Sequence, residues 1–309
     1  MVRPQMESVA RSAAILYKPA TTWRVRWNMY TDTPFPQEEP AGENPPDGAA
    51  IHYYLQETAK GEVAMEITDA SGKVVRRFSS NDAGYTLPAD LNIPTYWIRP
   101  QEKLSGERGA HRFVWDLRYA PLESTVSFPI AAVYNNTAPE TASPWVLPGN
   151  YTVTLIVNGQ AHTQPLVVKM DPRVKLSQEQ LSQLHTASLT CYQARQSALM
   201  NLQEISVVKK QIKEWLSGDR ADKEKIALLE QQVAEIEGAG GGRRARTVAA
   251  AQPGFATLEG QLSSIGSIWQ EADRLPTRQS MEALQQTLQA LGALQIKWNK
   301  LKEDIGQIK

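Results

Sequence analysis

Two stretches of the sequence decide the fold: Gly109-Ala-His-Arg-Phe-Val-Trp-Asp116 and Leu147-Pro-Gly-Asn-Tyr-Thr-Val-Thr-Leu-Ile-Val-Asn-Gly159. In both, apolar and aromatic residues recur at every second position, which is the period of a β-strand. The second stretch ends at Asn158-Gly159, a dipeptide typical of tight β-hairpin turns. We therefore predict that both stretches are strands of an immunoglobulin-like β-sandwich.

The period of two continues through residues 47–172, which we expect to form the sandwich domain. Further strands are predicted over residues 51–55, 63–68 and 73–78, and the turn Asp69-Ala-Ser-Gly72 connects the last two. Short strands at this spacing, separated by turn residues, are typical of a sandwich.

Two long insertions interrupt the predicted sandwich, at residues 79–108 and 119–146. Both are rich in Pro, Asn, Thr and Ser, and both contain aromatic residues. Loops of this length inside a compact domain are usually functional or packed on a neighbour. Two interpretations stay open: the insertions cover a sheet edge or dock on another domain, or their aromatic rings form a platform that binds sugars.

Residues 1–46 form a leading segment that ends in a proline-rich linker. Within it, Trp23-Arg-Val-Arg-Trp27 alternates aromatic and apolar residues with arginines, which predicts a strand. The run over residues 33–48 contains five prolines and two glycines, which argues against regular structure there. Four tryptophans from the leading segment and the insertions are expected to pack on the sandwich or to dock on a partner: Trp23, Trp27, Trp97 and Trp145.

Residues 173–309 change to helical periodicity. Ser177 followed three residues later by Gln180 has the spacing of a capping box, which predicts a helix start. Apolar residues then recur near heptad spacing, which predicts a coiled-coil-like helical hairpin or a small antiparallel bundle. Helix breaks are predicted at residues 217–219, residues 238–246 and Pro276. The fold class is therefore α+β with more than one domain.

The composition excludes several classes of partner and site. Lys+Arg and Asp+Glu both number 33, so overall charge does not favour nucleic acid or an anionic membrane as partner. No run of apolar residues is long enough to span a membrane. The single cysteine, Cys191, excludes an internal disulfide and a cysteine-rich zinc site. Residues 1–16 lack the features of a secretory signal, so the localisation stays open.

The motifs of catalysis are missing from the sequence, so we predict no catalytic, cofactor-binding or metal-binding residue. No Gly-x-Ser-x-Gly elbow is present, and the glycine-rich run before Arg243-Arg244 lacks the Lys-Ser/Thr of a phosphate-binding loop. Asp116, at the end of a predicted strand, is expected to form a turn, with cation binding as the alternative. The four histidines are far apart and lack metal-ligand spacing: His52, His111, His162 and His185.

Several stretches resemble known bacterial modules. Asp69-Ala-Ser-Gly-Lys-Val-Val-Arg76, together with the two strands quoted first, resembles the immunoglobulin-like module of the flagellar hook-capping type. A wider set resembles the C-terminal region of large bacterial sortilin-like or neuraminidase-repeat "glycosyl hydrolases", and the resemblance covers nearly the whole chain. This set is Lys18-Pro-Ala-Thr-Thr-Trp-Arg-Val-Arg-Trp27, Asn44-Pro-Pro-Asp-Gly48, Tyr96-Trp-Ile-Arg-Pro100 and Pro165-Leu-Val-Val-Lys-Met-Asp-Pro-Arg173.

The resemblance implies a role without chemistry of its own. Family members carry a β-propeller of repeated Asp-box turns, whereas here one loose match exists, Ser80-Asn-Asp-Ala-Gly-Tyr-Thr-Leu87. No catalytic residue of the family can therefore be carried over. The implied function is a C-terminal scaffold that braces a propeller and mediates protein–protein contact. The expected partner is a propeller domain or a second copy of the chain, and the helices either self-associate or fold back. The alternative is a carbohydrate-binding accessory module of a secreted glycoside hydrolase, and the relatives implied are secreted or periplasmic.

Overall fold

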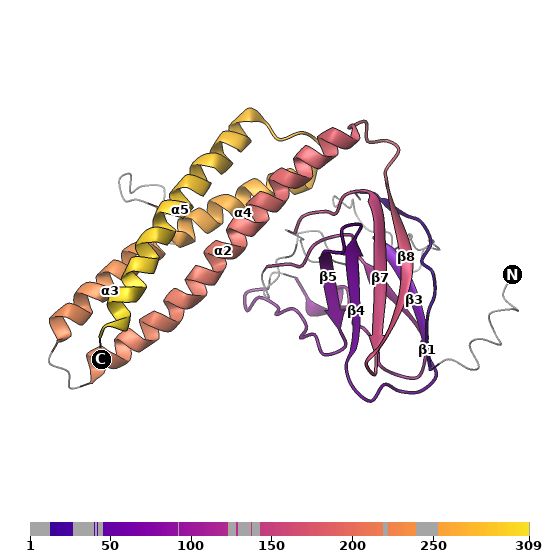
Figure 1. Cartoon of the computed structure of the whole chain (residues 1–309), viewed down its shortest axis with the longest axis horizontal. Coiled ribbons are helices and arrows are strands. Elements are labelled where there is room, and N and C mark those ends of the chain that lie inside the picture. The colour runs from indigo at the N-terminus through magenta and orange to yellow at the C-terminus, as the bar shows by residue number, and fades with distance from the viewer. Residues whose placement is uncertain are drawn as a thin grey trace, which may run out of the picture. The chain divides into compact units, whose positions relative to one another are not determined.

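The computed structural model describes residues 13–26, 46–91, 93–122, 143–218, 222–238 and 253–308, with the single residues 40, 42, 128 and 137. Two compact units, Met1–Lys175 and Leu176–Lys309, divide the chain (Figure 1). The described residues contain eight strands, all in the first unit, and four α-helices, all in the second. The chain is therefore α+β, and the boundary between its units falls after Lys175.

The strands of the first unit form two sheets. The three-stranded sheet has the order β1-β3-β6, and the five-stranded sheet has the order β2-β8-β7-β4-β5. Neighbouring strands are antiparallel, except that β2 pairs with β8 in parallel. The bounds are β1 Ala14–Leu16, β2 Thr22–Arg24, β3 Ala49–Leu55, β4 Val63–Asp69, β5 Val74–Ser79, β6 Gly109–Trp115, β7 Gly149–Val157 and β8 Gln160–Met170.

The predicted hairpin turn at Asn158-Gly159 is confirmed. Val157 of β7 lies opposite Gln160 of β8, so Asn158 and Gly159 form the whole turn. Their φ angles are 49° and 80°, the left-handed values that a two-residue turn of this type requires. Asn and Gly adopt such angles more readily than other residues, which explains why the dipeptide predicts the turn.

One apolar core lies between the two sheets. Val63, Met65 and Ile67 of β4 are fully buried, as the alternation in the sequence predicts. Residues of both sheets belong to the same cluster, in which Trp115 of β6 meets Tyr151 of β7 edge to face at 5.7 Å between ring centroids. The two stretches quoted first therefore contribute to the same core from different sheets.

The leading segment is part of the β unit, because it supplies one edge strand to each sheet. In β1, Ala14 and Leu16 are buried in the core, and in β2 the side chain of Arg24 is buried. The strand predicted over residues 23–27 overlaps β2, whereas the sequence does not predict β1, because a three-residue strand gives too few alternations. Trp27 and most of the proline-rich run lie outside the described residues.

The helices start and end where the sequence predicts. The Ser177 hydroxyl accepts the N–H of Gln180 at 3.2 Å, and the Gln180 side chain accepts the N–H of Ser177 at 2.9 Å, so the capping box is confirmed. The predicted breaks separate the four helices, which are α2 Gln178–Ser217, α3 Lys223–Glu237, α4 Phe255–Glu271 and α5 Arg278–Gly306.

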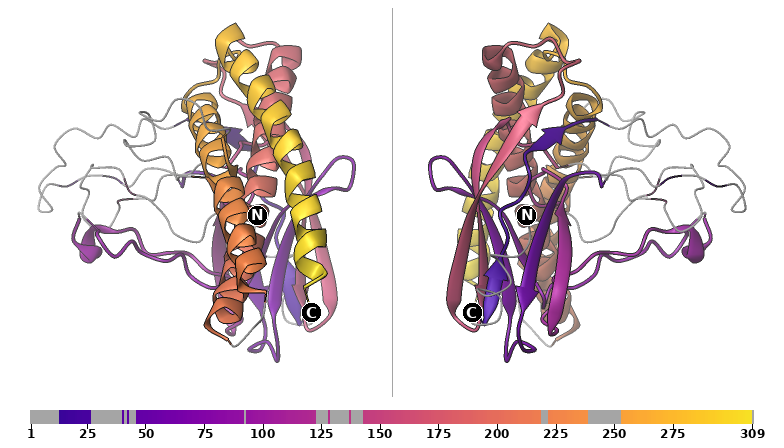
Figure 2. Two further views of the ribbon diagram at one scale, coloured as in Figure 1. Left: turned by 90° about the vertical axis from the view of Figure 1, so that its left-hand side faces the viewer. Right: turned by 90° about the vertical axis from the view of Figure 1, so that its right-hand side faces the viewer.

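The helical unit is a bundle rather than a hairpin, because all four helices share one apolar core. Figures 1 and 2 show α3 and α4 following one another along α2, with α5 beside them. Contacts between α2 and α4 run antiparallel, while those between α2 and α5 run parallel. Examples are Arg195 with Glu259 and Ser188 with Gln270 in the first pair, and Asn201 with Gln295 and Glu204 with Lys302 in the second.

The end of α3 touches the start of α4 through two glycines. A Cβ atom at Gly254 would lie 2.5 Å from the Cα of Gly238, and one at Gly238 would lie 2.7 Å from the Cα of Gly254. These are backbone contacts, so a flexible side chain cannot move aside to relieve them. Gly238 also has a φ of 74°, which favours glycine.

We predict that Gly254→Ala lowers the free energy of unfolding by about 2 kcal/mol, because the new methyl group forces the two helix ends apart. Urea unfolding followed by circular dichroism at the helical band measures the loss. Gly292→Ala, inside α5 with no atom within 4 Å of the new Cβ, is the matched control. It should gain up to about 1 kcal/mol from helix propensity. Equal effects of the two substitutions would contradict the proposed contact.

Candidate binding site

A surface cleft of about 350 Å³ opens in the β unit, beside the edge strand β2. Its walls are formed by the segment that contains β2, the start of β3 with the residues before it, the turn after β6, and Trp145. The lining residues are Ala20, Thr21, Thr22, Trp23, Val25, Pro46, Asp47, Gly48, Ala50, Leu117 and Trp145. Segments that are far apart in the sequence therefore meet at one site.

Two of the four predicted interaction residues, Trp23 and Trp145, lie in this cleft. The side chain of Trp23 is 48% exposed, and the Lys169 ammonium lies 5.5 Å from its ring centroid. Trp145 is partly buried, with the guanidinium of Arg118 at 4.0 Å and that of Arg26 at 5.4 Å from its ring. Both rings of the cleft therefore have cations close to them, and a cation is attracted by the quadrupole of the ring.

The turn after β6 forms part of the wall of the cleft. Leu117 has a φ of 58°, an uncommon angle for a bulky residue, and its side chain is buried. The indole of Trp115 donates to the carbonyl of Arg118 at 3.1 Å, and the N–H of Val146 donates to the carbonyl of Leu117 at 2.9 Å. These bonds hold Leu117 in a conformation that would otherwise be unfavourable.

Gly48 lets β3 approach this turn, because a Cβ atom there would collide with the carbonyl of Trp115. Next to it, the carboxylate of Asp47 lies 3.7 Å from the guanidinium of Arg99. Burial raises the pKa of Asp47, and the charge of Arg99 opposes this rise. Since Asp47 lines the cleft, its carboxyl group provides a hydrogen-bond acceptor there.

The other predicted residues lie elsewhere. Trp97 belongs to the short helix η1, Thr95–Trp97, is partly buried, and stacks edge to face with Tyr96 at 6.2 Å between centroids. It does not line this cleft. Trp27 lies outside the described residues. The sequence does not indicate that Leu117 lines a cleft, because nothing about a leucine predicts a positive φ.

Asp116 forms a turn, as predicted. Its Oδ1 atom accepts the N–H of Arg118 at 3.2 Å. Burial raises the pKa of the Asp116 carboxyl, while the charges of Arg76 and Arg118 oppose the rise. Two arginines beside one carboxylate make this position unsuited to a cation.

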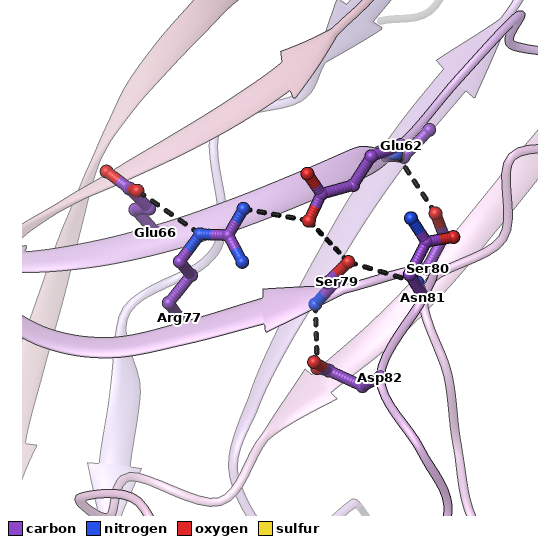
Figure 3. A network of polar contacts seen from close by, with 8 residues as sticks. Glu62, Glu66, Arg77, Ser79, Ser80, Asn81 and Asp82 are labelled. Carbon is purple, nitrogen blue, oxygen red and sulfur yellow. Dashed lines mark hydrogen bonds and ion pairs between the residues drawn. The ribbon is translucent and has the colours of Figure 1, made fainter.

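A second polar cluster surrounds the end of β5, at the start of the Asp-box-like stretch. Figure 3 shows Arg77 between two carboxylates, with Nη2 2.8 Å from Glu62 and Nε 3.6 Å from Glu66. The Ser79 hydroxyl donates to Glu62 at 2.5 Å, and the Ser79 N–H donates to Asp82 at 2.7 Å. The Ser79 bond, followed by that of Arg77, lowers the pKa of Glu62. This buried hydroxyl already donates to an ion-paired carboxylate, so the cluster ties β4 to β5.

Metal and thiol chemistry find no support in the described part of the chain. No group of three or more His, Cys, Asp or Glu side chains there is arranged to hold a metal ion. The Cys191 thiol is buried in the helical core and donates to the carbonyl of Leu262 at 3.2 Å. Burial raises its pKa to about 11, so it stays a thiol at neutral pH.

No described helix combines the length and the apolar character needed to cross a bilayer. Comparison of the chain with protein-family models, curated proteins and solved structures finds no match.

Proposed function

We propose that this chain is a non-catalytic interaction module whose cleft beside β2 recognises a segment of a partner protein. The observation that carries the proposal is the meeting of Trp23 and Trp145 in one cleft, with the guanidiniums of Arg26 and Arg118 over the ring of Trp145. Tryptophan and arginine are the residues most enriched among those that dominate the energy of protein–protein interfaces. The functional groups of the site are suited to contact and not to bond cleavage.

An immunoglobulin-like sandwich is the proposed scaffold for the cleft. Tyr151, near the start of β7, donates its hydroxyl to the carbonyl of Leu147 at 2.6 Å. A tyrosine that bonds to the backbone a few residues upstream is typical of immunoglobulin-like sandwiches, where it fixes a corner between sheets. The buried Trp115 beside Tyr151 also fits this architecture.

The sequence resemblance supports a scaffold role within the sortilin-like, neuraminidase-repeat group, in which the module would brace a propeller. The helical bundle extends this proposal. Met200 and Val207 lie one heptad apart on α2 and are 58% and 66% exposed, so they offer apolar contacts on the outside of the bundle. Self-association through α2 is the proposed use of this face.

Carbohydrate binding is the alternative function, and one observation favours it. The half-exposed indole of Trp23 lies with the hydroxyls of Thr21 and Thr22 and the carboxylate of Asp47 in one cleft. An aromatic face with a few polar groups beside it is a common arrangement in small-molecule sites. An oligosaccharide is therefore the natural competitor of a peptide in the test.

We predict that random peptides displayed on phage and selected on the whole chain will bind the cleft. Trp23→Ala should weaken the selected peptides by about 30-fold, the effect of losing one dominant aromatic contact. Tyr96→Ala removes a more exposed aromatic residue away from the cleft and is the matched control, expected to change binding less than about twofold. Fluorescence anisotropy with labelled peptides gives the dissociation constants.

Two results would reject this function. The first is a set of selected peptides that bind Trp23→Ala as well as they bind the unmodified chain. In the second, cello-, chito- or manno-oligosaccharides quench tryptophan fluorescence in the unmodified chain but not in Trp23→Ala, while no peptide is selected. The second result would establish the carbohydrate alternative.

A further inference from the structure

In three of the four edge strands, a side chain forms a hydrogen bond with a backbone group that points away from the sheet. An edge strand whose N–H and C=O groups are free is a template for pairing with another chain, and such side chains block that pairing. In β1, the side-chain amide of Gln164 donates to the carbonyl of Leu16 at 3.1 Å. In β6, the carboxylate of Glu102 accepts the N–H of Val114 at 3.2 Å. In β5, the carboxylate of Asp82 accepts the N–H of Ser79 at 2.7 Å.

The fourth edge, β2, is different. The carbonyl of Arg24 accepts the N–H of Asp171 at 3.3 Å, so the backbone groups of Arg24 face β8. Alternate residues of a strand direct their backbone groups to opposite sides, so the N–H and C=O of Trp23 face away from β8. Across the described ranges of the chain, no hydrogen bond to either of these groups of Trp23 is found.

The cleft lies beside β2. Residues 20–23 and Val25 line it, while Arg24 turns inward, where its guanidinium donates to the carbonyl of Val146 at 2.7 Å. The cleft is also lined by the apolar residue Ala50, which is partly buried. An occupant that pairs with this edge must therefore offer backbone-like donors and acceptors, and it also needs an apolar group for Ala50.

An extended peptide meets both requirements, because its backbone groups and its side chains point in different directions. A sugar lacks the regularly spaced N–H and C=O groups of a strand, so it does not extend the sheet. We infer that the outer edge of β2 accepts an extended segment of a partner protein as an added strand, with an apolar side chain of that segment against Ala50. This inference rests on the proposed function and specifies how the partner is bound.

The first test scans the backbone of a phage-selected, Trp23-dependent peptide with single N-methyl groups. Strand addition predicts an alternating result, because every second amide of the peptide points at β2. Methylation of those amides should weaken binding about tenfold, the value of one lost backbone bond, while methylation of the others should change it less than about threefold. The labelled peptide and the whole chain are the probes.

The second test changes the protein. Val25 is two residues from Trp23, so its N–H also faces away from β8. Val25→Pro deletes this N–H and leaves the ladder from Thr22 and Arg24 to β8, since proline is tolerated at the free edge of a sheet. Val25→Ala keeps the N–H and is the matched control. We expect about tenfold weaker peptide binding for Val25→Pro and less than threefold for Val25→Ala.

The outcomes separate this inference from the function on which it rests. Peptides that depend on Trp23 but show no alternation in the methyl scan, and that bind Val25→Pro and Val25→Ala equally, would overturn strand addition and leave the interaction module in place. Selection that yields no Trp23-dependent peptide would overturn both. A thermal melt of Val25→Pro within a few degrees of that of Val25→Ala confirms that the variant is folded. If it is not, the methyl scan on the unmodified chain decides.

Discussion

Trp115→Ala is expected to lower the free energy of unfolding of the β unit by about 4 kcal/mol. The indole of Trp115 is fully buried, packs against Tyr151, and donates a hydrogen bond to the carbonyl of Arg118. Removing it leaves a large cavity and an acceptor without its donor, and both effects act in the same direction. Because Trp115 also supports the turn that carries Leu117, the wall of the cleft should loosen as well.

The measurement is chemical unfolding followed by near-ultraviolet circular dichroism, which reports on packed aromatic side chains. Trp23→Ala is the control, since half of its side chain is already in water, and it should lose less than about 1 kcal/mol. If both variants were destabilised equally, Trp115 would not occupy the centre of the core and the shared core of the two sheets would have to be reconsidered.

Glu259→Gln is expected to destabilise the helical unit by about 3 kcal/mol. Glu259 of α4 accepts a hydrogen bond from Arg195 of α2 at 2.6 Å, and the two side chains are 18% and 10% exposed. Removal of the carboxylate leaves the guanidinium charge in a poorly hydrated position. The cost is therefore much greater than that of an ion pair on the surface.

Two further variants test whether the loss comes from the unpaired charge. Glu282→Gln breaks the ion pair with Arg278 on the surface of α5, where the side chains are 49% and 90% exposed, and should cost less than about 0.5 kcal/mol. The double variant Arg195→Met with Glu259→Leu should recover most of the loss, because it leaves no charge behind. Thermal unfolding at the helical band measures all three. A double variant as unstable as Glu259→Gln alone would contradict the electrostatic explanation.

Local signals in the sequence predict the features that depend on neighbouring residues. The capping box at Ser177 and the turn at Asn158-Gly159 are both found in the structure, because each is made by residues a few positions apart. The start of α4 is different. Its contact with the end of α3 joins Gly238 to Gly254, and no local rule predicts which two glycines will touch.

The candidate site shows the same limit. The sequence draws attention to Trp23 and Trp145, because aromatic residues stand out in a polar context. Their meeting in one cleft was not predictable, since it depends on β2 joining the five-stranded sheet beside β8 and on the positive φ of Leu117. The openness of the β2 edge is likewise a property of the assembled sheet.

The most direct measurement is the exchange of individual backbone amides with deuterium, followed by nuclear magnetic resonance, with and without a saturating selected peptide. The account predicts that the amides of Trp23 and Val25 exchange at least about tenfold more slowly in the complex, because each gains a hydrogen bond to the added strand. Unchanged exchange at both amides, with protection found instead around Tyr96 and Trp97, would contradict it and would place the partner on the other aromatic segment.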